Sequence, residues 1–82
     1  MLHVTEVRSA GPFRLWLAFS DGTAGEVDLE QELDGPIFEP LRDPTVFAKV
    51  ELDSEIHTIA WTNGADFAPE FLRDLVRNPV AA

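Results

Sequence analysis

Cysteine is absent from this 82-residue sequence, and basic residues are few. The lack of cysteine excludes a disulfide scaffold, a thiol nucleophile and thiolate metal ligands. It is also typical of a reducing compartment, so we expect a cytoplasmic location. No apolar run approaches the ~20 residues of a membrane-spanning helix, so no membrane association is expected. The first residues, Met1-Leu2-His3-Val4, are neither basic nor continuously apolar, which predicts no signal peptide.

Six lysines and arginines stand against fifteen aspartates and glutamates, which gives a formal net charge of −9. Proteins that bind nucleic acids neutralise phosphates with Lys and Arg, so we expect no direct nucleic-acid contact. Hydrophobic residues make up 45% of the chain, which is too many for a disordered protein. The length indicates one small domain over residues 1–82, with a flexible tail at about 78–82.

The negative charge is concentrated between Asp21 and Glu55. This segment contains eleven acids and only two basic residues, Arg42 and Lys49, so it alone has a formal charge of −9. One interpretation is that these acids are the solvated faces of strands and a loop, which also favours solubility. The other is a surface for a basic protein partner, because a localised charge speeds encounter with an opposite one.

The first third of the sequence has the pattern of three antiparallel strands. Residues 2–7 favour a strand, and residues 13–19 alternate with a period of two. Asp21-Gly22 then supplies the dipeptide of a type I′ turn, and residues 23–29 form the return strand. Trp16 points away from the four apolar residues of its strand, so a helix or a partner chain must cover it. From Trp16 and the small core we predict a homodimer.

The middle of the sequence predicts an irregular crossing with little regular structure. A helical turn is expected over residues 30–33, where Leu29 and Leu33 meet four residues apart. Asp43-Pro44 then marks the start of a short helix, because Asp caps helices and Pro suits the first helical position. This helix ends near residue 48.

The last third predicts two more strands and a final helix. Strands are expected over residues 49–53 and 56–61, and the helix runs from Pro69 to about Arg77, with Arg73 on its exposed side. The sum is five strands and two short helices in the order βββαββα. We therefore predict an α+β fold with a mainly antiparallel sheet and helices packed on one face.

The sequence contains no catalytic constellation, so we expect no enzyme and no catalytic residues. The three serines lie at predicted turns without the glycine-flanked setting of a nucleophile. His57 is expected to be a partly buried packing residue on its strand, and His3 a surface residue. Paired carboxylates are common in this acidic segment by chance, and none stands out as an acid–base pair.

The acidic run at residues 30–35 (Glu-x-Glu-x-Asp-Gly) resembles the opening of an EF-hand loop. The likeness then fails, because Pro36 takes the seventh position and Leu41 the twelfth, where the loop needs Glu. Glycine-rich phosphate-binding motifs are also absent. We therefore expect no metal site and no cofactor. A metal-dependent hydrolase that uses the acidic cluster is kept as an alternative.

Three segments of the sequence resemble one bacterial family. In the first segment, residues 19–22 read FSDG and residues 27–29 read VDL. Residues 35–44 read GPIFEPLRDP, and residues 59–70 read IAWTNGADFAPE. This combination is similar to the small proteins of the domain of unknown function 2442 family, which typically read WPNGADLxPE in the third segment. Thr62 and Phe67 depart from that pattern. The likeness extends from about residue 2 to residue 76.

The resemblance implies a small α+β domain and no established catalytic residues or cofactor. Some relatives carry a DNA-binding helix-turn-helix after this domain, which is not expected here because the chain ends at Ala82. Others are encoded beside a second small protein in an arrangement similar to toxin–antitoxin pairs. The resemblance therefore implies a protein partner.

Within the family signature we expect a structural role for four residues. Trp61 would end a strand and pack, and Asn63 and Gly64 would both take positive φ in a tight turn. Asp66 would accept hydrogen bonds from the main-chain N–H groups that lead into the helix at Pro69. A binding site at this turn is the alternative.

The leading hypothesis for function is a non-enzymatic protein-interaction module, in one form antitoxin-like, that presents its acidic surface to a basic protein. The candidate partner surface consists of Trp16, Glu26, Asp28, Glu30, Glu51 and Asp53. Besides the hydrolase, the alternative is a ligand-sensing or regulatory domain orphaned from a larger regulator. That alternative requires an apolar pocket with convergent polar groups.

Overall fold

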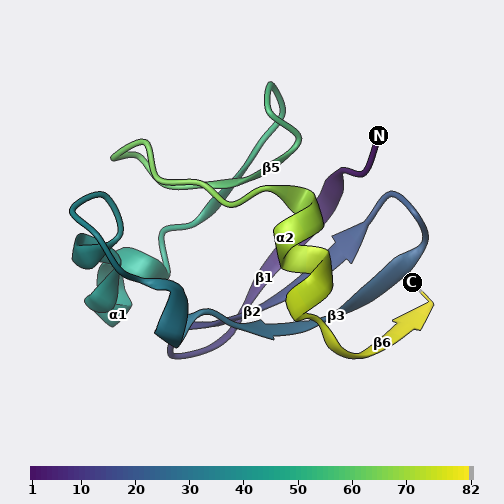
Figure 1. The fold of residues 1–82 in the computed structure, drawn as a ribbon, viewed down its shortest axis with the longest axis horizontal. Coiled ribbons are helices and arrows are strands. Elements are labelled where there is room, and N and C mark those ends of the chain that lie inside the picture. Colours follow the sequence, from purple (N-terminus) through teal and green to yellow (C-terminus); the bar gives the residue numbers. More distant parts are fainter. Residues whose placement is uncertain (82) are drawn as a thin grey trace.

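A four-stranded antiparallel sheet, called here the main sheet, forms the base of the domain. The computed structural model describes residues 1–81, with side chains as far as Val76. The strands of the main sheet are β1 (Val4–Gly11), β2 (Arg14–Phe19), β3 (Thr23–Asp28) and β6 (Arg77–Ala81). They lie in the spatial order β1-β2-β3-β6 (Figure 1). Short hairpins join the first three strands, so their registers are set locally.

A smaller sheet and four short helical segments complete the fold. The second sheet pairs β4 (Glu51–Asp53) with β5 (Thr58–Ala60) in antiparallel register. The helical segments are the 3₁₀ helices η1 (Glu30–Glu32) and η2 (Glu39–Arg42) and the α-helices α1 (Pro44–Phe47) and α2 (Pro69–Leu75). In Figure 1, α2 crosses in front of the main sheet, and α1 lies at the opposite end of the molecule from β6.

Alternation along β2 separates the two faces of the main sheet. Leu15 and Leu17 are fully buried on the inner face, whereas Arg14 and Trp16 lie on the outer face. One core cluster joins the inner face to the helices and to the second sheet. The largest fully buried side chains are Phe47, Leu15, Leu17, Leu29, Leu33, Leu41, Ile59, Leu72 and Val27. The apolar residues of all parts of the chain thus share one core.

The α+β class and the predicted order of three strands, a helix, two strands and a helix are confirmed. The start of α1 follows the Asp-Pro pattern, because the Asp43 carboxylate accepts a hydrogen bond from the Thr45 N–H (2.9 Å). Leu29 and Leu33 flank η1 and are both fully buried. The structure adds β6, which the sequence analysis did not predict.

The turn between β2 and β3 is not the predicted type I′ turn. Three residues, Ser20 to Gly22, separate the strands, and only Gly22 has a positive φ (86°). The Gly22 N–H donates to the Phe19 carbonyl (3.1 Å), as in a three-residue loop built on a type I turn. The Asp21 carboxylate accepts hydrogen bonds from the N–H (3.0 Å) and the hydroxyl (2.6 Å) of Thr23, which stabilises this longer loop.

The final helix is shorter than the sequence analysis predicted. α2 ends at Leu75, and Val76 is already extended (φ −62°, ψ 126°). Helices usually end before the residue that precedes a proline, and Pro79 follows closely. The backbone then continues as β6 beside β3. Ala82 and the side chains from Arg77 onward lie outside the described part of the chain, so the flexible tail at about 78–82 stays a prediction.

The strand predicted over residues 56–61 is confined to Thr58–Ala60, and His57 is not a packing residue on it. His57 lies in the turn after β4 with a φ of 57°, and its N–H donates to the Asp53 carbonyl (2.9 Å). The turn therefore leaves His57 exposed. Its ring stacks on that of His3, with centroids 4.0 Å apart, and His3 is half-buried instead of lying freely on the surface.

Candidate partner-binding surface

The six residues of the predicted partner surface lie on two different sheets and on η1. Trp16, Glu26 and Asp28 project from the outer face of the main sheet, and Glu30 begins η1, one residue after the end of β3. The other two lie on β4. The second sheet contacts β1, which is two strands away from β3. The structure therefore brings together the group near η1 and separates it from the group on β4.

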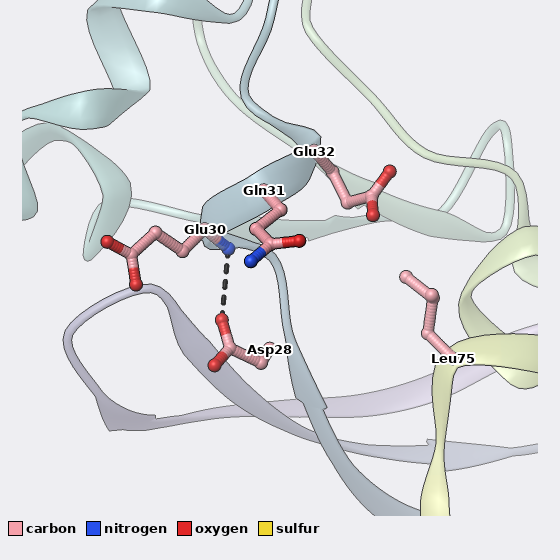
Figure 2. Close-up of a pocket in the computed structure, with 5 residues that line it drawn as sticks. All are labelled: Asp28, Glu30, Gln31, Glu32 and Leu75. Atoms are coloured by element: carbon pink, nitrogen blue, oxygen red, sulfur yellow. Dashed lines mark hydrogen bonds between the residues drawn. The ribbon is translucent and has the colours of Figure 1, made fainter.

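A pocket of about 190 Å³ opens between η1 and α2. Figure 2 shows that the Glu32 side chain points across it toward Leu75, whereas the Glu30 carboxylate points away from Leu75. The Glu30 N–H donates to the Asp28 carboxylate (3.0 Å), which fixes the start of η1 (Figure 2). We call this pocket the η1–α2 groove. Its lining residues are Asp28, Glu30, Gln31, Glu32 and Leu75.

The backbone of η1 is held by the core. Leu29 and Leu33 stand immediately before and after η1, and both are fully buried. The Leu29 N–H donates to the Phe13 carbonyl (2.8 Å). The Arg42 guanidinium donates to the Leu33 carbonyl (3.0 Å) and to the Asp34 carboxylate (3.0 Å). The acids of η1 are therefore presented on a fixed backbone.

The acids of the β4–β5 hairpin lie on a less anchored segment. They line an open hollow of about 430 Å³ that includes residues 51–55 and 60–62. Leu52 and Ile56 in this hairpin are 40% and 46% exposed. The Asp53 carboxylate accepts hydrogen bonds from the N–H groups of Glu55 (2.8 Å) and Ile56 (3.4 Å), so it stabilises the turn.

Trp16 lies between charged residues on the outer face of the main sheet. Its neighbours in register are Arg8 on β1 and Glu26 on β3. The Arg8 guanidinium carbon is 5.2 Å from the centre of the indole ring, within the range of a cation–π contact. Trp16 is half-buried and does not belong to the core cluster. Among the described residues, Trp16 therefore contacts Arg8, and none of the helices covers its side chain.

The signature turn ties three segments together. The buried Trp61 donates its indole N–H to the Phe47 carbonyl at the end of α1 (3.0 Å). The Asn63 side chain donates to the Ile37 carbonyl (2.8 Å) and accepts from the Ala65 N–H (3.0 Å). Through these contacts Trp61 and Asn63 hold the turn to α1 and to the segment around Ile37.

Two details of the predicted turn are wrong. Only Gly64 has a positive φ (93°), and Asn63 does not. The Asn63 side-chain oxygen accepts the hydrogen bond of the Ala65 N–H, as a main-chain carbonyl would in another type of turn. The Asp66 carboxylate is exposed and accepts no hydrogen bond from the described main chain. Asp66 contributes instead through its backbone, which forms an isolated bridge with Ala60.

An ion pair that the sequence did not reveal joins the β2–β3 loop to α2. Arg73 Nε lies 3.3 Å from Asp21 Oδ2, and the Arg73 side chain is half-buried, although it was predicted on the exposed side of the helix. Hydrogen bonds from the hydroxyl and the N–H of Thr23 lower the pKa of Asp21, and Arg73 adds a smaller effect in the same direction, against desolvation. The pair spans 52 residues, so no local pattern could indicate it.

The EF-hand-like run does not converge on one centre. Asp34 pairs with Arg42, and in the part of the chain that the structure describes no three His, Asp or Glu side chains gather so that they could hold a metal ion. Among the same residues no helix is long and apolar enough to cross a membrane.

The fold and the acidic surface together define a small α+β domain, and comparison with known proteins gives its family. The family described as "Protein of unknown function (DUF2442)" matches residues 4–78, so the chain belongs to that family. The structure is similar to the crystal structure of a putative DNA binding protein from Nitrosomonas europaea, with a TM-score of 0.80 and 26% sequence identity. The match covers 93% of this chain and 49% of that protein, so this chain spans about half its length. No curated protein matches the sequence.

Proposed function

We propose that this domain is a non-enzymatic protein-interaction module whose acidic surface binds a basic protein. The observation that carries the proposal is the uneven pairing of charges. The ion pairs of the described side chains use Glu6, Asp21, Asp28 and Asp34. The acids of η1 and of the β4–β5 hairpin form no ion pair with a described side chain, and their charge would attract a positive surface. These acids are Glu30, Glu32, Glu51, Asp53 and Glu55.

The geometry of the acids also supports a module without catalysis. Asp28, Asp43 and Asp53 each accept a hydrogen bond from a main-chain N–H two residues further on. Such bonds hold turns and helix starts in place, so these three carboxylates have a structural role. The remaining acids of the segment provide charge on the surface.

The structural neighbour bears on the kind of partner. It is a putative DNA binding protein, and this domain corresponds to about half of its length. Since a domain with a net charge of −9 repels phosphates, we infer that it binds the basic surface of a nucleic-acid-binding or toxin-like protein. Antitoxin-like masking of that surface is one form of the proposal. A cytoplasmic location fits the lack of cysteine.

Affinity purification of the full chain from its native host tests this function. We expect a stoichiometric basic protein that stays bound at about 0.1 M salt and is released at about 1 M, where screening is strong. A matched variant in which Glu30, Glu32, Glu51 and Glu55 are all changed to Gln should lose it. Absence of any basic partner at low salt would contradict the proposal, as would direct retention of the domain on duplex DNA.

A ligand-sensing domain is the second candidate, and the hollow beside the β4–β5 hairpin favours it by size, although its lining is acidic and not the apolar pocket expected from the sequence. Its volume of about 430 Å³ falls within the range of about 300–1,000 Å³ typical of small-molecule sites. Its acidic lining would select an organic cation. In a Trp16→Phe background, a cationic ligand in this hollow should change the fluorescence of Trp61, which is one of the lining residues. Unchanged fluorescence across a panel of organic amines would exclude it.

The exposed side of Trp16 also leads us to propose a homodimer through the outer face of the main sheet. Light scattering at high micromolar concentration should give twice the monomer mass. Trp16→Ala should return the protein to the monomer mass, while a monomeric wild-type protein would contradict this assignment.

A further inference from the structure

α2 presents three different sides to its surroundings. Leu72 is fully buried in the core, and Arg73 on another flank pairs with Asp21. Phe71 and Leu75 stand four residues apart, so they are neighbours on one face of the helix. Phe71 is 39% exposed and Leu75 is half-buried. An apolar stripe therefore remains at the surface of α2, next to the η1–α2 groove that Leu75 lines.

Stacked phenyl rings from two other segments support this stripe. The ring of Phe71 stacks on that of Phe67, with centroids 5.5 Å apart and planes at 10°. Phe67 in turn stacks on Phe38, at 4.8 Å and 24°. Phe67 is buried, so the outermost ring rests on a fixed base. The stripe is thus a rigid apolar edge that needs little ordering when a partner binds.

Acids border the stripe on both sides. Across the groove, Glu32 points toward Leu75 (Figure 2). On α2 itself, Asp74 is three residues from Phe71 and therefore adjacent to it on the helix surface, and Glu70 is also exposed. The charge beside the stripe is negative, which favours an occupant that is both apolar and basic.

The volume of the groove limits what can enter it. About 190 Å³ is less than the ~300 Å³ of the smallest usual small-molecule sites. It is somewhat more than the ~150 Å³ of an apolar cavity that accepts benzene. The groove is therefore of the size of one large side chain, and a side chain from another protein suits it better than a whole small molecule.

We propose that the η1–α2 groove and the adjacent Phe71 form the docking site for a basic amphipathic segment of the partner protein. The apolar stem of one Lys or Arg side chain of this segment enters the groove along Leu75, and an aliphatic side chain covers Phe71. The charged ends of its Lys or Arg side chains meet Glu32 across the groove and Asp74 beside Phe71 on α2. The inference rests on the proposed function and narrows the partner surface to η1 and α2, without Trp16 and without β4.

An NMR titration of the ¹⁵N-labelled full chain tests this docking site. The probe is a synthetic helical peptide of leucine and lysine with the leucines on one face, and the control peptide has the same composition with the leucines scattered. We expect the largest shift changes at Glu32, Phe71 and Leu75 with the first peptide, and weaker binding of the control. Phe71 is partly exposed, so Phe71→Ser should remain folded and weaken binding.

Three charge-reversal variants locate the contact. Glu32→Lys should weaken binding of the amphipathic peptide by about tenfold, because it replaces an attraction with a repulsion. Glu55→Lys changes the net charge equally but lies in the β4–β5 hairpin, outside the lining of the groove, so the loss should be about twofold. Glu51→Lys on β4 is a second distant control and should behave like Glu55→Lys.

The possible results separate this inference from the function on which it rests. If the peptide binds and the shifts centre on residues 51–55, or if Glu51→Lys weakens binding as much as Glu32→Lys, the docking site is wrong while a basic partner stays supported. Equal binding of both peptides would also contradict the groove as the docking site. If neither peptide binds and no basic partner is captured at low salt, the proposed function itself fails.

Discussion

The η1 segment and the β4–β5 hairpin carry similar acidic charge on very different supports. η1 stands between two fully buried leucines, Leu29 and Leu33, and Arg42 bonds its last turn. In the hairpin, β5 is anchored by the fully buried Ile59 and by the Thr58 hydroxyl, which donates to the Phe67 carbonyl (2.6 Å). Its acids lie on β4 and the turn, where Leu52 and Ile56 are 40% and 46% exposed. Negative charge alone does not distinguish the two segments. The difference lies in how firmly each backbone is fixed, and a fixed surface loses less entropy when it binds.

The largest difference in stability is expected when one leucine of each segment is replaced by alanine. Leu33→Ala should reduce the free energy of unfolding by about 2–5 kcal/mol, because it leaves a cavity in the core. Leu52→Ala removes the same atoms from the hairpin and should cost about 1 kcal/mol or less. Urea unfolding at constant m-value measures both. Equal losses would mean that β4 is as firmly anchored as η1.

A second test concerns a polar attachment of the β4–β5 hairpin to α1. Trp61, just after β5, donates its indole N–H to the Phe47 carbonyl. Trp61→Phe keeps an aromatic ring but removes the indole hydrogen bond and some buried volume, and it leaves the Phe47 carbonyl with only the longer bond from the Val50 N–H (3.3 Å). We therefore expect a loss of about 1–3 kcal/mol in urea unfolding. Amide exchange should rise in the hairpin more than in η1. Faster exchange in η1 alone would contradict this attachment.

A smaller effect is expected for the polar support of η1. Arg42→Met keeps much of the apolar stem and removes the hydrogen bonds to the Leu33 carbonyl and to Asp34. Because the guanidinium is partly exposed, the loss should be about 1 kcal/mol. Lys49→Met is the matched removal of a positive charge beside the hairpin. Hydrogen exchange of residues 29–34 should rise in the first variant and stay unchanged in the second.

The smallest effect concerns Asp21, an acid outside both segments whose carboxylate is held by Thr23 and Arg73. Its pKa is lowered in the folded protein, so its contribution to stability is present above the unfolded pKa and is lost as the pH falls through the folded pKa. Thr23→Val keeps the N–H bond and removes the hydroxyl bond, which is the largest single cause of the lowered pKa, so it should raise the pKa of Asp21 more than Arg73→Gln. An NMR pH titration of the Asp21 carboxyl carbon measures the pKa in both variants. A larger rise of the pKa in Arg73→Gln than in Thr23→Val would contradict this prediction.

Local patterns predicted local structure well in this chain. The alternation around Leu15 and Leu17 predicted the inner face of β2, and Asp43-Pro44 predicted the start of α1. Predictions for turns were weaker. The dipeptides Asp21-Gly22 and Asn63-Gly64 were each expected to place two residues at positive φ, but in both cases only the glycine does so. Side-chain hydrogen bonds to nearby N–H groups decided these turns, and several turn geometries fit the same dipeptide.

The partner surface was the least predictable feature, because it depends on contacts between distant segments. Strand alternation and the abundance of acids predicted one surface for Glu26, Asp28, Glu51 and Asp53. Glu32 and Leu75 were not predicted there, although they line one groove, because 43 residues separate them in the sequence. The stacking of Phe38 on Phe67 likewise needs the crossing segment to fold back against the signature turn.

The sequence by itself determined the class of fold, the family and the place of the negative charge along the chain. These features depend on composition, on periodicity and on motifs of a few neighbouring residues, which act over one turn or one strand. Only the tertiary structure decided which acids stand on a rigid backbone, that Arg73 closes on Asp21, and that Glu32 faces the apolar stripe of α2. Those outcomes follow from the packing of one shared core, which brings together residues that no local pattern connects.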